Sequence, residues 1–188
     1  QITPRAGLPF RLIGAHLKSK APHGARTPED ARAISITNRR KQLAQAVWLR
    51  ARIEDHLQAG VPLVLMGDLN DGPGLDVYEA LFGRSSVEII MGAELVDPHA
   101  RQLLRPNRQG LPTSARFYNH LDKRYFQALL DYAMVSPELM SFDPQWRIWH
   151  PFEDAGCYGT PDLCQALLAA SDHFPVTLDL DLTRPSGG

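Results

Sequence analysis

Two polar residues directly follow an apolar run in the stretch VPLVLMGDLND, residues 61–71. Asp68 and Asn70 are two residues apart, and residues at this spacing project to the same side of an extended strand. A carboxylate can bind a metal ion or accept a proton from water, and an amide can donate a hydrogen bond to a phosphoryl oxygen. The stretch is also rich in turn-forming residues, and on this motif alone a plain turn is the favoured interpretation.

Three further segments place an Asp or a His beside apolar sequence. In SDHFPV, Asp172 could bind a hard cation through oxygen, and His173 could accept a proton from a water nucleophile. In LLDYAMVS, the charge of Asp131 is costly unless it is paired, and a neighbouring His would pair it. In GAHLKS, His16 ends a strand-like run. The structural alternatives are a solvated turn for the Asp172–His173 pair, an exposed sheet edge for Asp131 and a structural role for His16.

The elements expected to position these residues alternate between strands and helices. Apolar, β-compatible sequence predicts strands at 10–19 and 61–68, and periodic apolar residues predict a helix over 38–59 that Gly60 ends. The polar segment 20–37 contains prolines and a glycine and is expected to be mostly loop. This order suggests an α/β crossover in which the second strand is buried on both faces.

The middle of the chain is expected to hold shorter elements. A short helix is predicted over 74–83, and a short strand or extended segment over 86–97. The segment 101–114 has the composition of a loop.

The last third is expected to be rich in strands. Segments 115–119 and 128–136 flank a charged turn and could pair as antiparallel strands. Further strands are predicted over 145–151 and 174–182. The whole chain, 1–188, is therefore expected to form a single α/β domain with a mixed sheet.

Composition and charge place few limits on function. The 188 residues are 44% hydrophobic and 22% charged, which is ordinary for a globular domain with a real core. The formal net charge of -1 gives no overall attraction toward nucleic acid or an anionic membrane, although a local basic groove would still allow a nuclease. No apolar run approaches the roughly 20 residues needed to span a bilayer.

Cys157 and Cys164 are the only cysteines in the sequence. A loop disulfide and two free thiols are equally compatible with their spacing, and two thiols are too few for a structural zinc site. The pair leans toward an oxidising compartment, but the location stays open between periplasmic or secreted and cytoplasmic.

Four segments together resemble the endonuclease/exonuclease/phosphatase superfamily, which includes DNase I-like and exonuclease III-like enzymes. They are GAHLKS, LMGDLND, LLDYAMVS and SDHFPV, and they occur in the family's order between residues 12 and 176. Each segment is weak alone, but the ordered set is specific, above all GDLN followed by SDHFP. The resemblance implies a DNase I-like four-layer sandwich, in which two packed mixed β-sheets are flanked by helices.

The resemblance also implies Mg²⁺-dependent hydrolysis of a phosphoester, with Mn²⁺ as an alternative metal. His173 resembles the family's general base, and Asp131 resembles the carboxylate that orients it. Asp172 resembles a metal ligand.

The remaining candidates resemble groups that contact the reacting phosphate. Asp68 and Asn70 are similar to the pair that positions the attacking water and the phosphorus. His16 matches a position that contacts the scissile phosphate, so Asn70 and His16 are the predicted substrate-binding residues.

One part of the family pattern is absent from the sequence. The superfamily carries an Asn and a metal-binding Glu on strands before the first His, but the 15 residues before His16 contain neither type. We therefore expect the chain to be the C-terminal two-thirds of the fold, incomplete at the N-terminus and lacking its main Mg²⁺ ligand. Such a chain would be catalytically incomplete alone and would associate with itself or with a missing N-terminal segment.

A metal-dependent, nuclease-like phosphodiesterase is the leading functional hypothesis, with DNA or RNA as the narrowly favoured substrate. The alternatives are a catalytically incomplete or non-catalytic interaction domain of the same fold, and an esterase for lipid headgroups or inositol phosphates. The basic residues of the 38–59 helix are more typical of a solvated face. Phe117, Tyr118 and Tyr125 lie near Arg116 in the sequence and could stack bases, although such aromatics more often lie in a core.

Overall fold

Two parallel strands and the long helix between them form the first half of the chain. In the computed structural model, β1 (Arg11–Gly14) pairs in parallel with β2 (Leu63–Asp68), and α1 (Pro28–Gln58) connects them. The predicted α/β crossover is therefore confirmed. The structure describes residues 1–4, 8–73, 79–105, 110–119 and 123–183.

Three sets of paired strands lie within the described residues. β5 (Asp131–Val135) pairs antiparallel with β2, which gives a mixed sheet of order β1-β2-β5. β3 (Ala115–Asn119) and β4 (Arg124–Ala128) form an antiparallel pair, and β6 (Gln145–Ile148) and β7 (Val176–Asp179) form another.

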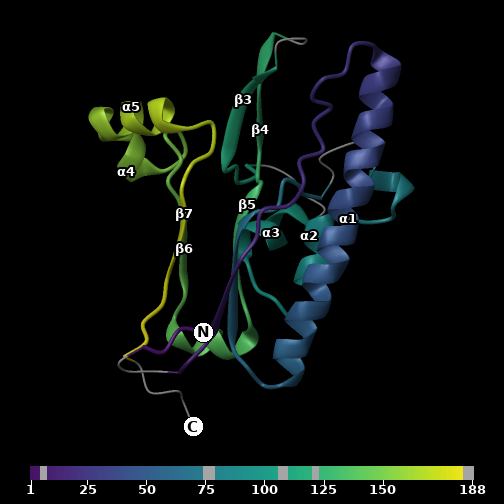
Figure 1. Cartoon of the computed structure of the whole chain (residues 1–188). Coiled ribbons are helices and arrows are strands. Elements are labelled where there is room, and N and C mark those ends of the chain that lie inside the picture. The colour runs from purple at the N-terminus through teal and green to yellow at the C-terminus, as the bar shows by residue number, and fades with distance from the viewer. Residues whose placement is uncertain (5–7, 74–78, 106–109, 120–122, 184–188) are drawn as a thin grey trace.

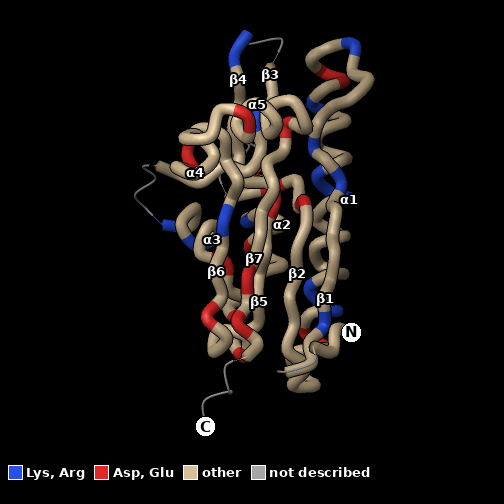
Figure 2. The backbone as a smooth tube through the Cα atoms, turned by 90° about the vertical axis from the view of Figure 1, so that its left-hand side faces the viewer, with Lys and Arg blue, Asp and Glu red and all other residues tan. Residues whose placement is uncertain are grey.

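The β1-β2-β5 sheet lies between a helical layer and the β6–β7 pair (Figure 1). On one side are α1 and the short helices α2 (Ser86–Met91) and α3 (Pro98–Leu103). On the other side is β6–β7, and Figure 2 shows α4 (Ala155–Tyr158) and α5 (Pro161–Ala170) near the same end as the β3–β4 hairpin. Two 3₁₀ turns, Glu79–Leu81 and Pro137–Phe142, complete the described elements.

Strand β2 is buried on both faces, as its unbroken apolar sequence predicts. Leu63 and Leu65 pack into the helical side, in a cluster with Ile53 of α1. Val64 points to the opposite side and packs with Phe142, in a cluster that Trp146 of β6 borders. This double burial fixes the register of β2 and hence the place where the strand ends.

Helix α1 begins ten residues earlier than the sequence pattern predicts, so the expectation of a loop over 20–37 is wrong in its second half. The Thr27 side chain caps the helix by accepting a hydrogen bond from the Asp30 amide, and Pro28 occupies the first helical position. Glu29 and Asp30 add favourable charge to the first turn. The proline that suggested a loop is in fact part of the helix start.

The strand or extended segment expected over 86–97 is also wrong in its first half, where α2 forms instead. The Ser85 side chain accepts from the Glu88 amide, and the Glu88 carboxylate accepts from the Ser85 amide. This capping box starts a helix, and Ile90 buries its β-branched side chain in the helical core. Local capping and tertiary packing therefore outweigh the strand propensity of the segment.

The expected pairing of 115–119 with 128–136 is wrong. β3 pairs with β4, a strand that begins at Arg124 within the predicted charged turn, whereas β5 joins the central sheet. The strand over 145–151 and the last strand over 174–182 are confirmed, although β6 and β7 are shorter.

Two other expectations are only partly tested. The described end of the 74–83 segment forms a 3₁₀ turn, and residues 74–78 lie outside the described residues. The start of the expected 101–114 loop belongs to α3, and residues 106–109 are not described.

Both cysteines are free, with Cys157 buried in α4 and Cys164 partly exposed in α5. The disulfide alternative is therefore not what the structure shows. Among the described helices, none has the length and apolar character required to pass through a membrane.

Candidate active site

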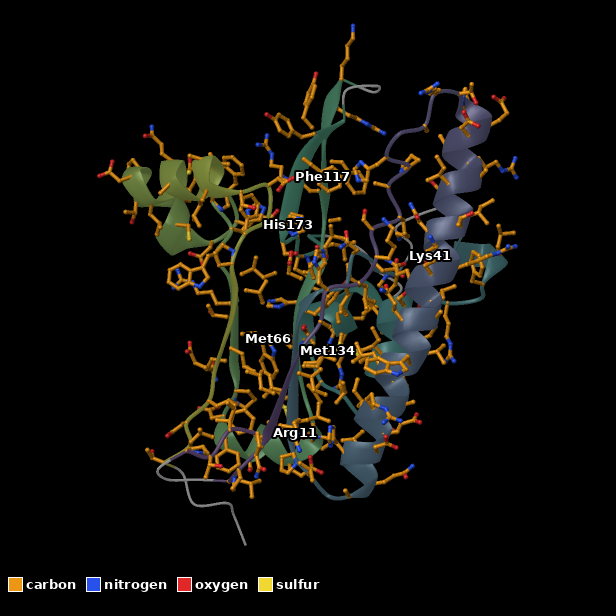
Figure 3. All side chains as sticks on the ribbon, in the orientation of Figure 1. Arg11, Lys41, Met66, Phe117, Met134 and His173 are labelled. Atoms are coloured by element: carbon orange, nitrogen blue, oxygen red, sulfur yellow. The ribbon has the colours of Figure 1, made fainter. Side chains whose placement is uncertain are left out.

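The predicted chemical residues meet at one end of the central sheet. β2 ends at Asp68 and β5 begins at Asp131, and the antiparallel register places these two residues directly opposite each other. His173 precedes β7 and forms an isolated bridge with Ala115 at the start of β3. Figure 3 shows His173 next to the base of the β3–β4 hairpin. Residues more than 100 positions apart in sequence are thus brought to one place.

Asp131 and His173 form a hydrogen-bonded pair. The Nδ1 atom of His173 lies 2.8 Å from Asp131 Oδ2, and both side chains are mostly buried. Ser114 supports this carboxylate: its hydroxyl donates to Asp131 Oδ2 at 2.8 Å and accepts from the Asp131 amide at 2.9 Å. Asp131 does lie on an edge strand of the described sheet, but its carboxylate faces His173 and Ser114 rather than solvent. Ser114 was not predicted, because a serine in loop-like sequence carries no signal of its partner 17 residues away.

Asp68 and Asn70 occupy a turn and still share one space. The backbone amide of Asn70 donates to Asp68 Oδ1 at 2.7 Å, and its side-chain Nδ2 donates to Asp68 Oδ2 at 2.9 Å. Asn70 has a φ of 50°, in the left-handed region. The turn interpretation is thus confirmed, and the turn itself folds the amide back onto the carboxylate.

His16 lies at the exposed rim of the same group. Its Nε2 atom is 3.5 Å from Asp68 Oδ2, and 77% of its side chain is exposed. This places an imidazole where a bound molecule could reach it, with Asp68 as its neighbour.

Asp172 is less closely associated with the other candidates. Its backbone carbonyl accepts from the Arg116 amide at 2.7 Å, and its exposed carboxylate is 3.5 Å from the Ser171 hydroxyl. In the described part of the chain, the cluster suited to a metal ion contains Asp68, Asp131 and His173 but not Asp172. The role of Asp172 as a metal ligand stays a prediction.

The electrostatics of the site follow from burial and from the two carboxylates. Burial raises the pKa of Asp68, and the nearby charge of Asp131 raises it further. The hydrogen bond to Asp131 raises the pKa of His173 above its usual range, although burial opposes this. The site therefore favours extra positive charge between the two carboxylates.

A divalent cation fits this donor set. One ligand atom from each of Asp68, Asp131 and His173 lies within 4.8 Å of the others. Hard cations such as Mg²⁺ prefer carboxylate oxygen, and a cation would offset both the burial and the nearby Asp131 charge that raise the pKa of Asp68. The two aspartates are therefore the better ligands, and the imidazole is the poorer one.

A buried ion-pair network holds the turn that carries Asn70. The fully buried carboxylate of Asp71 accepts from Lys20 Nζ at 2.6 Å and from Arg39 at 2.9 Å. It also accepts from the Ser86 amide at 2.7 Å, which ties the turn to α2. Arg39 was expected on a solvated basic face of the helix, and that expectation is wrong, because it is only 1% exposed and paired with Asp71.

Gln42 links α1 directly to the backbone of the same turn. Its Nε2 atom donates to the carbonyls of Lys18 and Asn70, each at 2.9 Å. Its carbonyl accepts from the Ser86 hydroxyl at 3.2 Å. Gln42 therefore anchors the left-handed residue Asn70 from behind and was not predicted, since an isolated Gln on a helix has no distinctive pattern.

Gly67 is required just before Asp68. Its φ is 141°, and a Cβ atom at this position would lie 1.9 Å from the carbonyl oxygen of Ala15 in the neighbouring chain segment. The absence of a side chain therefore allows a close backbone approach at this point of the strand.

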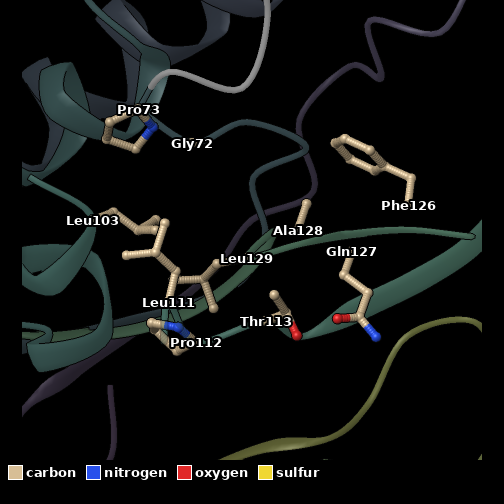
Figure 4. A pocket seen from close by; sticks show the side chains of 10 residues that line it. All are labelled: Gly72, Pro73, Leu103, Leu111, Pro112, Thr113, Phe126, Gln127, Ala128 and Leu129. Carbon is tan, nitrogen blue, oxygen red and sulfur yellow. The ribbon is translucent and has the colours of Figure 1, made fainter. Parts of the chain in front are cut away.

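The paired residues Asp131 and His173 line a hollow at the end of the central sheet. A cavity of about 320 Å³ is lined by Gly67, Asp131 and His173. A second hollow of about 220 Å³ lies between Gly72, Leu103 and Leu129 and contains none of the predicted catalytic side chains (Figure 4). We therefore associate the chemistry with the 320 Å³ cavity.

The family comparison agrees with this geometry. The model of the Endonuclease/Exonuclease/phosphatase family matches residues 16–173, a span that begins at His16 and ends at His173. The chain belongs to the endonuclease/exonuclease/phosphatase family. Members of this family are generally hydrolases of phosphoester bonds that use a divalent metal. No curated protein and no solved structure matches the chain.

Proposed function

We propose that this member of the endonuclease/exonuclease/phosphatase family is a Mg²⁺-dependent phosphodiesterase of nuclease type, in which water attacks phosphorus in line. The observation that carries the proposal is the pairing of His173 with Asp131 in one cavity, with a carboxylate oxygen of Asp68 within 4.8 Å of ligand atoms of both. A paired imidazole and a second, separate carboxylate are what water activation at a charged phosphate requires.

His173 acts as the general base. Because its Nδ1 faces Asp131, Nε2 is the ring atom free to accept a proton from water. Asp131 fixes the ring orientation and stabilises the imidazolium that forms, and Ser114 holds Asp131 in place. Ser114, Asp131 and His173 therefore form one hydrogen-bonded chain that ends at the proposed base.

Asn70 and His16 contact the phosphate, with one change to the predicted role of Asn70. Both N–H bonds of its side chain are already used, by Asp68 Oδ2 at 2.9 Å and by the Leu17 carbonyl at 3.1 Å. Donation to a phosphoryl oxygen therefore requires Asn70 to release one of these partners. His16 needs no such exchange, because it is exposed.

Asp68 and Asp131 would hold the metal, with Asp172 as a further predicted ligand. Asp131 can serve both the metal and the base, because His173 and Ser114 both use Oδ2 and leave Oδ1. A bound Mg²⁺ would supply positive charge that offsets the charge developing on the phosphate oxygens.

For the fold, the more detailed proposal is a four-layer sandwich, which membership of the family supports. The helical layer, the β1-β2-β5 sheet and the β6–β7 pair are consistent with three of those layers. The described cluster offers two carboxylates and one imidazole, which is a small donor set for Mg²⁺.

A substrate panel on the full-length protein tests the function. The panel contains a DNA and an RNA oligonucleotide, bis(p-nitrophenyl) phosphate, an inositol phosphate and a phosphocholine lipid, each with Mg²⁺, with Mn²⁺ and with chelator. We expect hydrolysis of the diesters with metal, loss with chelator, and ¹⁸O from labelled water in the phosphate product. Hydrolysis that continues in chelator would contradict the proposal.

A further inference from the structure

Arg116 carries a positive charge that has no acidic partner within the described residues. Its guanidinium carbon lies 3.6 Å from the ring centre of Tyr125 and 5.1 Å from that of Phe152. No ion pair and no side-chain hydrogen bond of Arg116 occurs among the described residues. Stacking on rings occupies the flat faces of a guanidinium and leaves its N–H edge available for an anion.

The backbone places Arg116 next to the proposed catalytic residues. Its amide donates to the Asp172 carbonyl at 2.7 Å, and the preceding residue, Ala115, forms the bridge with His173. Arg116, Tyr125 and Asp172 line a hollow of about 660 Å³. This hollow therefore adjoins the site of the proposed reaction, on the side of the β3–β4 hairpin.

Arg147 provides an internal comparison. It also stacks on a ring, 3.6 Å from the centre of Trp149, but two of its nitrogens donate to Asp154, each at 2.8 Å. The two guanidinium groups lie at the same distance from a ring centre, and among the described residues only that of Arg147 is paired with a carboxylate. Within the described parts of the chain, a carboxylate thus pairs with Arg147 but not with Arg116, whose N–H edge is available to an outside anion.

We propose that Arg116 binds a second phosphate of the substrate, so that the preferred substrates carry two or more phosphates. This inference rests on the proposed function, because the first phosphate is the one that reacts beside His173. A guanidinium matches two oxygens of one phosphate at once. Asp172 lines the same hollow and would repel an anion, so a single guanidinium is expected to add selectivity rather than dominate affinity.

The proposal separates the candidate substrates by their chemistry. Oligonucleotides and inositol polyphosphates offer a second phosphate, whereas a phosphocholine headgroup offers only one. Arg116 therefore argues against single-phosphate lipid headgroups as the preferred substrates.

Binding measurements test this inference without turnover. Calorimetry on the full-length His173→Ala protein, with Mg²⁺, compares thymidine 3′,5′-bisphosphate, inositol 1,4-bisphosphate and thymidine 5′-monophosphate. We expect Arg116→Met to weaken binding of the bisphosphates about 10-fold and to change monophosphate binding by less than about 2-fold. The bisphosphate whose binding falls more identifies the carrier of the second phosphate. Arg147→Met is the matched control and should leave all three affinities unchanged.

The inference would be overturned if Arg116→Met weakened the binding of the monophosphate and the bisphosphates equally, or weakened the binding of neither. If that variant does not fold, Arg116→Lys keeps the charge but not the two-pronged contact, and we expect an intermediate loss of about 3-fold for the bisphosphates only. Failure of the substrate panel would refute the proposed hydrolysis, whereas the binding result addresses Arg116 separately.

Discussion

The imidazole of His173 lies 2.8 Å from the carboxylate of Asp131, although 42 residues separate them in the sequence. The sheet register explains the contact: β5 starts at Asp131 beside the end of β2, and the segment before β7 bridges to β3. Asp68 lies opposite Asp131 on β2. The proposed base, its orienting acid and a second acid are therefore brought together by backbone pairing.

Substitution of Asp131 tests the orienting role. In Asp131→Asn, an amide replaces the carboxylate, so the ring of His173 loses its anionic partner and the imidazolium is no longer stabilised. We expect kcat on the best diester substrate to fall about 100-fold or more, with KM within about 3-fold of wild type. Steady-state kinetics measure both. Asp162→Asn, at an exposed position in α5, is the control, and a kcat for Asp131→Asn as high as that of the control would refute the role.

Substitution of Gly67 tests the strand end that carries Asp68. In Gly67→Ala, the new Cβ atom would collide with the Ala15 carbonyl, and φ is unfavourable for alanine. We expect the free energy of unfolding to fall by more than about 3 kcal/mol, measured by urea denaturation. Gly14→Ala on the paired strand β1 is the control, because a Cβ atom there would meet nothing within 4 Å and the backbone is not left-handed. Equal stability of the two variants would contradict the explanation.

Substitution of Gln42 tests the support of Asn70 from behind. Gln42→Met keeps the side-chain length but removes the hydrogen bonds that Nε2 donates to the Lys18, Leu69 and Asn70 carbonyls. We expect kcat to fall about 10-fold with KM nearly constant, because Asn70 and Asp68 lose their fixed geometry. Gln45→Met is matched, since Gln45 also contacts Lys18, through the Lys18 amide at 2.8 Å, but does not reach the Asn70 turn. If both variants lose kcat equally, Gln42 has no special role in the site.

The chemical residues could be predicted from the sequence because each lies at the end of an apolar segment. Asp68 follows the buried run of β2, and His173 precedes the alternating run of β7. The ordered motifs then located five residues that the structure connects: His16, Asp68, Asn70, Asp131 and His173.

The supporting residues could not be predicted in this way. Ser114, Asp71 and Gln42 act through partners 15 to 51 positions away, several of them backbone groups, so nothing local marks them. The helical character of 86–91 was hidden for a different reason, because Val87 and Ile90 favour strands until α2 buries them against α1. Both the supporting residues and the helix over 86–91 therefore depend on tertiary contacts that local sequence does not reveal.

The buried residue His150 gives a pH prediction outside the active site. It is only 2% exposed, and its Nδ1 accepts from the amides of Phe152 and Glu153, which requires the neutral ring. Burial lowers the pKa of His150, although Glu153 opposes this. We expect NMR titration to find its pKa below the usual value of about 6.5.

The lowered pKa of His150 also determines how the stability of the folded chain changes with pH. Below about pH 6.5 the unfolded chain binds a proton at His150 and the folded chain does not, so this residue's contribution to stability is lost as the pH falls toward the folded pKa. In His150→Gln, the side-chain carbonyl can accept the same amides without titrating. We expect urea denaturation to show that the free energy of unfolding falls less between pH 7.5 and pH 5.0 in the variant than in wild type. An equal fall in both proteins would contradict this role of His150.

The most direct test of the central claim compares His173→Ala with His23→Ala in the full-length protein, on the best diester from the substrate panel with Mg²⁺. Removal of the proposed base should lower kcat about 1,000-fold, whereas removal of the exposed His23, far from β7 in sequence, should leave it within about 2-fold of wild type. A kcat for His173→Ala that equals the kcat for His23→Ala would contradict the account.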